Sequence, residues 1–297
     1  MEETIAGTRT LSDTWVLTEP TTLRGSPGAC IEGHARDALI RVRAPVTIEN
    51  LEIRRVARPD GTPSWGSLIV VEPGGELIVS GCRLEGAAHG HIVERGATLG
   101  PGEAWVHAGV DVRGTGRAVV QKGEFLQCCL GTLASVYPRT AYLNLEVDAC
   151  RFEGCAGAVQ VSAAGRGSAR KSVARGPGAV AYYLQDGELA LERCEARDLD
   201  TGIAANAGKL KVRGGRVERA RVGIRCDGNG VAAARDCTIE GSTGVAAAAA
   251  GLGSLELRDC TVAAGAGNGL EVVGAARLDA RGGSVEVASA ALLALDA

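Results

Sequence analysis

Large side chains are scarce in this sequence. Aromatic residues make up 3% of its 297 positions and Met occurs once, whereas Gly occurs 43 times. Ordinary globular cores are filled largely by bulky side chains, so this composition excludes such a core. Hydrophobic residues still reach 45% and charged residues only 23%, which excludes intrinsic disorder. We therefore expect a buried interior built from small and branched apolar residues.

A strong excess of one charge is also missing. The net charge of −3 argues against a nucleic-acid partner. The N-terminus carries Glu2 and Glu3 and no apolar run, which argues against a secretory signal. No stretch stays apolar over the roughly 18 residues that a membrane helix requires. We therefore expect no membrane span and a cytoplasmic or other intracellular location.

Metal-binding patterns are absent as well. The ten Cys residues form no CxxC pair and no Cys/His cluster with the spacing typical of zinc ligands. In a chain without a secretory signal, such cysteines are expected to be free thiols in a reducing compartment. We predict that they are reduced and mostly buried, and that the protein needs no metal and no other cofactor.

A short motif recurs along the chain. Leu255–Val262 reads LELRDCTV, which gives the template L-x-L-x-x-C-x-V. Its sixth position, here called the anchor, is occupied by Leu51, Cys82, Gly123, Cys150, Cys194, Gly215, Cys237, Cys260 and Gly283. The last five anchors lie 21 to 23 residues apart. The longer gap before Cys194 predicts a degraded copy with Lys171 at the anchor.

A second segment follows each anchor and reads Gly-apolar-x-small. It begins at Gly202, Gly223, Gly244 and Gly269. The alternation in both segments indicates strands, and the pieces between them are too short and Gly-rich for helices. Coils of about 22 residues that return to their starting point stack as parallel strands about 4.8 Å apart. The sequence therefore predicts an all-β parallel β-helix (solenoid) of about 11 coils.

We expect one domain over residues 1–297, with 1–38 as N-terminal cap and first coil and 187–295 as the most regular coils. The combined pattern G-I-x-[small]…L-x-L-x-x-C-x-I resembles the repeat of the pectin-lyase-like superfamily, which implies a right-handed helix. A leucine-rich repeat shares part of the template, and Leu252 supplies its upstream Leu, but Asp186 and Ala207 occupy that position elsewhere. A left-handed helix would need 18-residue coils, which the spacings do not fit.

The resemblance implies a carbohydrate-active enzyme as one possible function. Its members include pectate lyases, polygalacturonases and epimerases, and also non-catalytic intracellular β-helices. In the enzymes, substrate lies in a groove on one sheet, walled by inserted loops. Candidate acids and bases in such loops are His91, Glu94, His107 and Asp111. The polygalacturonase runs N-T-D, D-D and R-I-K are missing.

The leading prediction is therefore a non-catalytic intracellular scaffold that binds other protein subunits in a larger assembly. The alternative is a carbohydrate-active enzyme, a polysaccharide lyase, hydrolase or epimerase, with a cleft on the side of the β-helix. The absent acid motifs and the scarce aromatic residues favour the scaffold. Only the alternative implies a polysaccharide partner.

Two outward columns are candidate binding surfaces. The first carries Arg213, Arg235, Arg258 and Arg281, each two residues before an anchor. It predicts either a strip that binds an acidic ligand or partner, or a solvated ladder beside the turns. The second is rich in alanine and is centred on Ala181, Ala204 and Ala246. A flat apolar face of this kind is a surface that another protein can cover.

Overall fold

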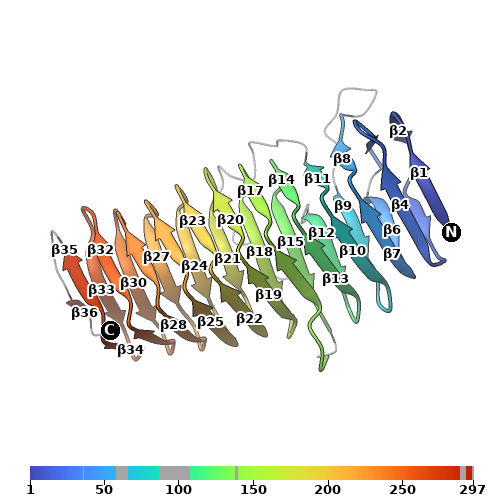
Figure 1. Cartoon of the computed structure of the whole chain (residues 1–297). Helices are drawn as coiled ribbons and strands as arrows, with labels where there is room; N and C mark the ends of the chain where they lie inside the picture. The colour runs from blue at the N-terminus through green and yellow to red at the C-terminus, as the bar shows by residue number, and fades with distance from the viewer. Residues whose placement is uncertain (36, 58–65, 87–107, 138–139, 288–291, 296–297) are drawn as a thin grey trace.

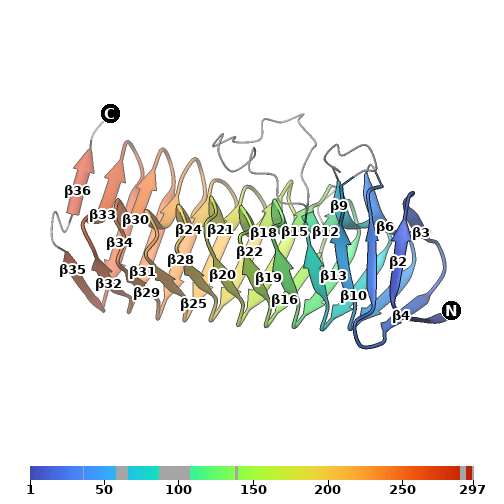
Figure 2. The same ribbon diagram turned by 90° about the horizontal axis from the view of Figure 1, so that it is seen from above.

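The computed structural model describes residues 1–35, 37–57, 66–86, 108–137, 140–287 and 292–295. Within them the chain forms three parallel sheets of twelve strands each, and successive strands pass from one sheet to the next in a fixed rotation. The stacked coils make an elongated rod with the N-terminus near one end and the C-terminus near the other (Figures 1 and 2). The right-handed parallel β-helix of about 11 coils predicted from the repeat is confirmed.

Sheet A contains the L-x-L part of the repeat. Its inward positions stack apolar side chains on each other: Leu189 pairs with Leu210, which pairs with Ala232. Its strands are β1 (Glu2–Ile5), β4 (Thr21–Gly25), β7 (Pro45–Glu49), β10 (Glu76–Ser80), β13 (Arg117–Gln121), β16 (Leu145–Asp148), β19 (Arg166–Arg170), β22 (Glu188–Glu192), β25 (Lys209–Arg213), β28 (Val231–Arg235), β31 (Ser254–Arg258) and β34 (Arg277–Arg281).

Sheet B follows sheet A after a sharp corner and consists of short strands. Only one or two side chains per strand point inward, so two outer columns are left for charged residues. Its strands are β2 (Thr8–Leu11), β5 (Cys30–Gly33), β8 (Glu52–Arg55), β11 (Arg83–Glu85), β14 (Glu124–Leu126), β17 (Arg151–Glu153), β20 (Val173–Arg175), β23 (Glu195–Arg197), β26 (Arg216–Glu218), β29 (Thr238–Glu240), β32 (Thr261–Ala264) and β35 (Ser284–Val287).

Sheet C carries the Gly-apolar segments and completes the triangular cross-section. Its strands are β3 (Trp15–Leu17), β6 (Ala38–Val42), β9 (Ser67–Val71), β12 (Ala108–Arg113), β15 (Leu130–Ser135), β18 (Gly157–Ser162), β21 (Val180–Leu184), β24 (Thr201–Ala205), β27 (Val222–Cys226), β30 (Val245–Ala250), β33 (Asn268–Val273) and β36 (Leu292–Leu295). One continuous apolar cluster runs inside the three sheets from Ile5 to Leu270. Each fully buried Leu, Ile or Val contributes roughly 1.5–3 kcal/mol through burial.

The corner between sheets A and B uses one residue in the left-handed conformation. Arg193, Asp236 and Asp259 occupy it with φ of 52°, 52° and 51°. The anchor follows directly and turns inward, which buries the five anchor cysteines. Of the other five, all except the half-buried Cys129 are buried as well. The prediction that the thiols are mostly buried is therefore confirmed.

The degraded copy of the repeat is displaced by one residue from the prediction. Lys171 has φ of 50° and occupies the left-handed corner, and the fully buried Ser172 is the anchor. The Ser172 hydroxyl donates to the Arg170 carbonyl at 3.0 Å and accepts from the Cys150 amide at 3.2 Å. Because its polar atom is satisfied by the backbone, serine replaces cysteine here without an orphaned hydrogen-bonding group.

Aromatic side chains enter the core where neighbouring positions are small. Phe125 and Phe152 stack with their ring centroids 4.7 Å apart. A Cβ at Gly131 would lie 2.2 Å from the Phe152 ring, and one at Gly109 would lie 2.7 Å from the Phe125 ring. Glycine on sheet C therefore provides the space that each ring on sheet B fills. Among the described residues, Tyr182 is the largest fully buried side chain.

Candidate active site

Asp111 is a buried carboxylic acid on the outer face of sheet C. In β12, Val110 and Val112 point inward and are fully buried, so alternation places Asp111 and Arg113 together on the outer face. Asp111 pairs across the sheet with Val70 and Leu133 and is only 3% exposed. A carboxylic acid this deeply covered requires an explanation.

Asp111 has one satisfied and one unsatisfied oxygen. Arg113 Nε donates to its Oδ2 at 2.8 Å. Its Oδ1 is buried and has no hydrogen-bond partner in the part of the chain that the structure describes. Burial raises the pKa of Asp111 above its ordinary value, although Arg113 and Ser67 act in the opposite direction. Asp111 therefore holds a proton more strongly than an ordinary carboxyl group does.

Asp37 supplies a second carboxylate at the same place. It directly precedes β6, and its carbonyl accepts a hydrogen bond from the Ser67 amide at 2.9 Å, which holds it beside β9. Arg113 Nη2 lies 2.8 Å from Asp111 Oδ2 and 3.9 Å from Asp37 Oδ1. These two oxygens are therefore no more than about 7 Å apart. This upper limit is compatible with the carboxyl separations of glycoside hydrolases, roughly 5–5.5 Å in retaining enzymes and from about 6.5 Å in inverting ones. Asp37 is 49% exposed at its side chain.

Further ion pairs fix the surroundings of this carboxyl pair. Arg41 binds Asp37 and also donates to Glu72 at 2.7 Å. Arg43 donates to the same Glu72 carboxylate at 2.6 Å. The hydrogen bond from Arg43 is the main reason why the pKa of Glu72 is below its ordinary value. The site therefore contains a covered acid, an exposed carboxylate and guanidinium groups that orient both.

Of the four predicted catalytic residues, the structure describes one. His91, Glu94 and His107 lie outside the described residues, while Asp111 is the buried acid. Sequence reasoning missed Asp37, because no motif surrounds it and its proximity to Asp111 depends on the order of the coils. Among the described residues, no group of three or more His, Cys, Asp and Glu side chains could hold a metal ion. No helix in the same part of the chain is long and apolar enough to cross a membrane.

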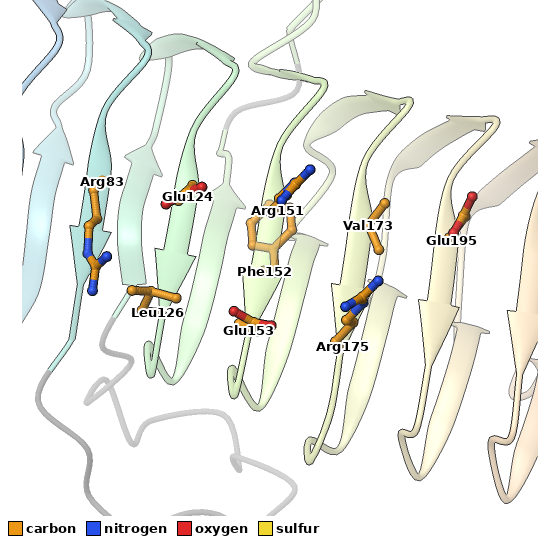
Figure 3. Close-up of a pocket in the computed structure, with 9 residues that line it drawn as sticks. All are labelled: Arg83, Glu124, Leu126, Arg151, Phe152, Glu153, Val173, Arg175 and Glu195. Carbon is orange, nitrogen blue, oxygen red and sulfur yellow. The ribbon is translucent and has the colours of Figure 1, made fainter.

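The outer face of sheet B contains a shallow hollow of about 360 Å³. Figure 3 shows the residues that line it on successive strands from β11 to β23. In one column Glu52, Arg83, Glu124 and Arg151 follow one another in register. Basic and acidic side chains balance each other along this face, and Phe152 beneath them belongs to the core. The hollow therefore offers no preference for a ligand of either charge.

The predicted alanine face is wrong. Ala181 and Ala246 are fully buried and Ala204 is 7% exposed. Ala204 pairs with Tyr183 and Arg225, and Ala248 pairs with Arg225. The three predicted alanines therefore do not share a column. The Gly-apolar template was placed two residues too early on β21 and β30, since Tyr182 rather than Val180 pairs with Ile203, and Ala247 rather than Val245 pairs with Ile224.

The arginine column has the predicted register. Arg213, Arg235, Arg258 and Arg281 pair in succession on adjacent strands of sheet A. All four are at the outer surface of the sheet, because the residues on either side of the column in sequence face the core or the corner. The expectation of a ligand at this column remains a prediction.

Comparisons with known proteins give likenesses of structure only. No family model and no curated protein matches the sequence. The structure is similar to an endo-xylogalacturonan hydrolase from Aspergillus tubingensis, with 11% identity over 99% of this chain and 88% of that chain and a TM-score of 0.47. It is also similar to the catalytic unit of a thermostable GH87 alpha-1,3-glucanase from Streptomyces thermodiastaticus strain HF3-3, with 10% identity over 99% of this chain and a TM-score of 0.47. This chain spans 62% of the glucanase chain.

The prediction of a non-catalytic scaffold is corrected. The alanine face that was predicted to bind other protein subunits is not formed, since Ala181 and Ala246 belong to the interior. Both similar structures are named as hydrolases. The structure itself establishes the fold, a parallel β-helix of three sheets.

Proposed function

We propose that the protein is a carbohydrate-active enzyme that hydrolyses a polysaccharide on the outer face of sheet C. The observation that carries this proposal is the carboxyl pair Asp111 and Asp37 on one arginine, with the pKa of Asp111 raised by burial. Cleavage of a glycosidic bond requires an acid that protonates the leaving oxygen and a carboxylate that acts on the other side of the bond. Perturbed carboxyl groups of this kind cluster at functional sites.

The two carboxyl groups have different roles. Asp111, which retains its proton to higher pH, is the acid that donates to the glycosidic oxygen; because it is only 3% exposed, the substrate must displace the groups that cover it. Asp37, which is half exposed, activates a water molecule or attacks the sugar carbon directly. Arg113 contacts both carboxyl groups and is a positioning residue, as is Arg41 beside Asp37.

The face beside this pair suits an extended chain. The column that contains Asp111 continues along the rod through Leu133, Gln160, Tyr183 and Ala204. Tyr183 offers a half-buried ring against which a sugar can pack, and Gln160 offers an amide that donates and accepts hydrogen bonds. A polysaccharide that follows the rod axis would meet the carboxyl pair at one end of this column.

The proposal is tested by release of reducing ends from a panel of neutral and acidic polysaccharides. Asp111→Asn and Asp37→Asn should each lower kcat by about 10²–10⁴-fold, the contribution of general acid–base catalysis. Asp198→Asn is the matched control, because Asp198 is an exposed aspartate paired with Arg219 elsewhere on the rod. It should leave kcat unchanged. The proposal is refuted if no polysaccharide is cleaved, or if Asp111→Asn retains full activity while remaining folded by circular dichroism.

A further inference from the structure

We propose that the outer face of sheet A carries a binding strip for an acidic polysaccharide, formed by Lys211, Arg213 and Arg235 on β25 and β28. This strip lies on a different sheet from the carboxyl pair and goes beyond the proposed catalytic function.

The cations of the strip lack partners. Arg213 and Arg235 are exposed and stack in register, and within the described chain neither side chain, nor that of Lys211, has an ion pair or hydrogen bond in the structure. The next two arginines differ, since Arg258 binds Glu256 and Arg281 donates to Asp279 at 2.7 Å. The four-arginine column therefore divides into a free half and a neutralised half.

Two acidic residues face the strip without neutralising it. Glu192 pairs in register with Arg213, and Asp236 follows Arg235 at the corner. Neither forms an ion pair with these arginines. Like charges stacked on adjacent strands repel each other, so Arg213 and Arg235 gain stability when an anion lies between them.

The surface that carries these cations is hollowed. A groove of about 590 Å³ lies over β19 to β28. One column of side chains runs along its middle, Ser168, Ala190, Lys211 and Ala233, and a second runs along one side, Arg170, Glu192, Arg213 and Arg235. A second hollow of about 330 Å³ adjoins it at the corner and includes Arg193 and Arg213. The groove crosses the strands, so it runs along the rod axis.

The spacing of the cations favours a glycan over other polyanions. Neighbouring strands lie about 4.8 Å apart, which is comparable to the length of one pyranose unit in an extended chain. An extended peptide presents side chains on one face only every 6.8 Å or so. Single-stranded nucleic acid is held by aromatic side chains on which its bases stack, and the residues that line the groove include no aromatic side chain. Guanidinium groups bind carboxylates through paired hydrogen bonds, so a polyuronate is the matching class.

The test measures binding at low salt to four immobilised polymers: alginate as a polyuronate, dextran as a neutral glycan, poly-L-glutamate and oligo-deoxythymidine. We expect binding to alginate and not to the other three. Arg213→Gln combined with Arg235→Gln should raise the Kd for alginate by at least tenfold. Arg151→Gln combined with Arg175→Gln removes the same charge from exposed arginines on sheet B and should change the Kd by less than twofold.

Each other outcome overturns the proposal. Preferred binding of poly-L-glutamate would make the strip a site for an acidic protein segment, and preferred binding of oligo-deoxythymidine would make it a nucleic-acid site. Equal weakening by the two double variants would show that only net charge matters, and equal binding of dextran would show that charge does not matter. The binding assay requires no cleavage of the polymer, so a failure of the proposed catalysis is distinguished from a failure of this site.

Discussion

Gly131→Ala tests whether the aromatic rings and the glycines of the interior fit as described. The new methyl group would lie 2.2 Å from Phe152 Cδ1 and 2.8 Å from the Ala158 carbonyl oxygen, so the ring and the strand must both move. Overpacking of this kind costs about 1–3 kcal/mol of unfolding free energy. Phe152→Ala removes the ring and should cost about 3–5 kcal/mol through lost burial and a cavity.

The double variant is the informative one. With the ring absent, the methyl group introduced at position 131 no longer meets it, so the double variant should be more stable than the sum of the single effects by about 0.5–3 kcal/mol. Urea unfolding followed by circular dichroism measures each free energy. Gly202→Ala combined with Phe152→Ala is the control: a Cβ at Gly202 meets Val217 instead, so its effects should add to within about 0.5 kcal/mol. Additivity in the Gly131 pair would refute the reasoning.

Three further predictions concern buried polar groups. The pKa of Asp111 is raised on folding, so the folded state binds its proton more strongly than the unfolded state does. Stability therefore falls as pH rises from the ordinary carboxyl pKa through the raised value. Asp111→Asn should remove this fall and be more stable than the parent at neutral pH, as measured by urea midpoints across that range. Tyr182→Phe removes a hydroxyl that donates to the Ser172 carbonyl at 2.8 Å and should cost about 1 kcal/mol in the same assay, whereas a cost near zero would contradict the bond. Thiol titration should find only Cys129 readily reactive in the native protein and all ten cysteines after denaturation, and several fast native thiols would contradict the burial.

The repeat could be recognised from sequence because its core positions are chemically uniform. Leu, Val, Ile and Cys recur at the inward positions of sheets A and B, so the period of the anchors located the regular coils, while the degraded coil at Ser172 was misplaced by one residue. The corner residues are also visible in part, since Asp236 and Asp259 precede their anchors and adopt the left-handed conformation. These features depend on residues within one coil.

The sequence-based predictions failed at positions whose environment depends on neighbouring coils and not on one coil alone. Ser172 does not look like a core residue, because the backbone atoms that satisfy its hydroxyl belong partly to the neighbouring coil. Alanine is equally compatible with both faces of sheet C, so nothing in the composition of β30 revealed that Ala246 points inward. Asp37 and Asp111 approach each other across an intervening strand, β9, and such a contact requires the register of three coils.

The alternating column on sheet B has a consequence for folding. A solenoid of similar coils can misfold by skipping one coil and pairing a strand with its second neighbour. In the column that runs through Glu52, Arg83, Glu124 and Arg151, correct neighbours have opposite charges and second neighbours have equal ones. A skipped coil would place Arg83 beside Arg151, or Glu52 beside Glu124, at a cost of roughly 0.2–1 kcal/mol for each like pair. The charges of this column therefore disfavour pairing between strands of non-adjacent coils while the chain folds.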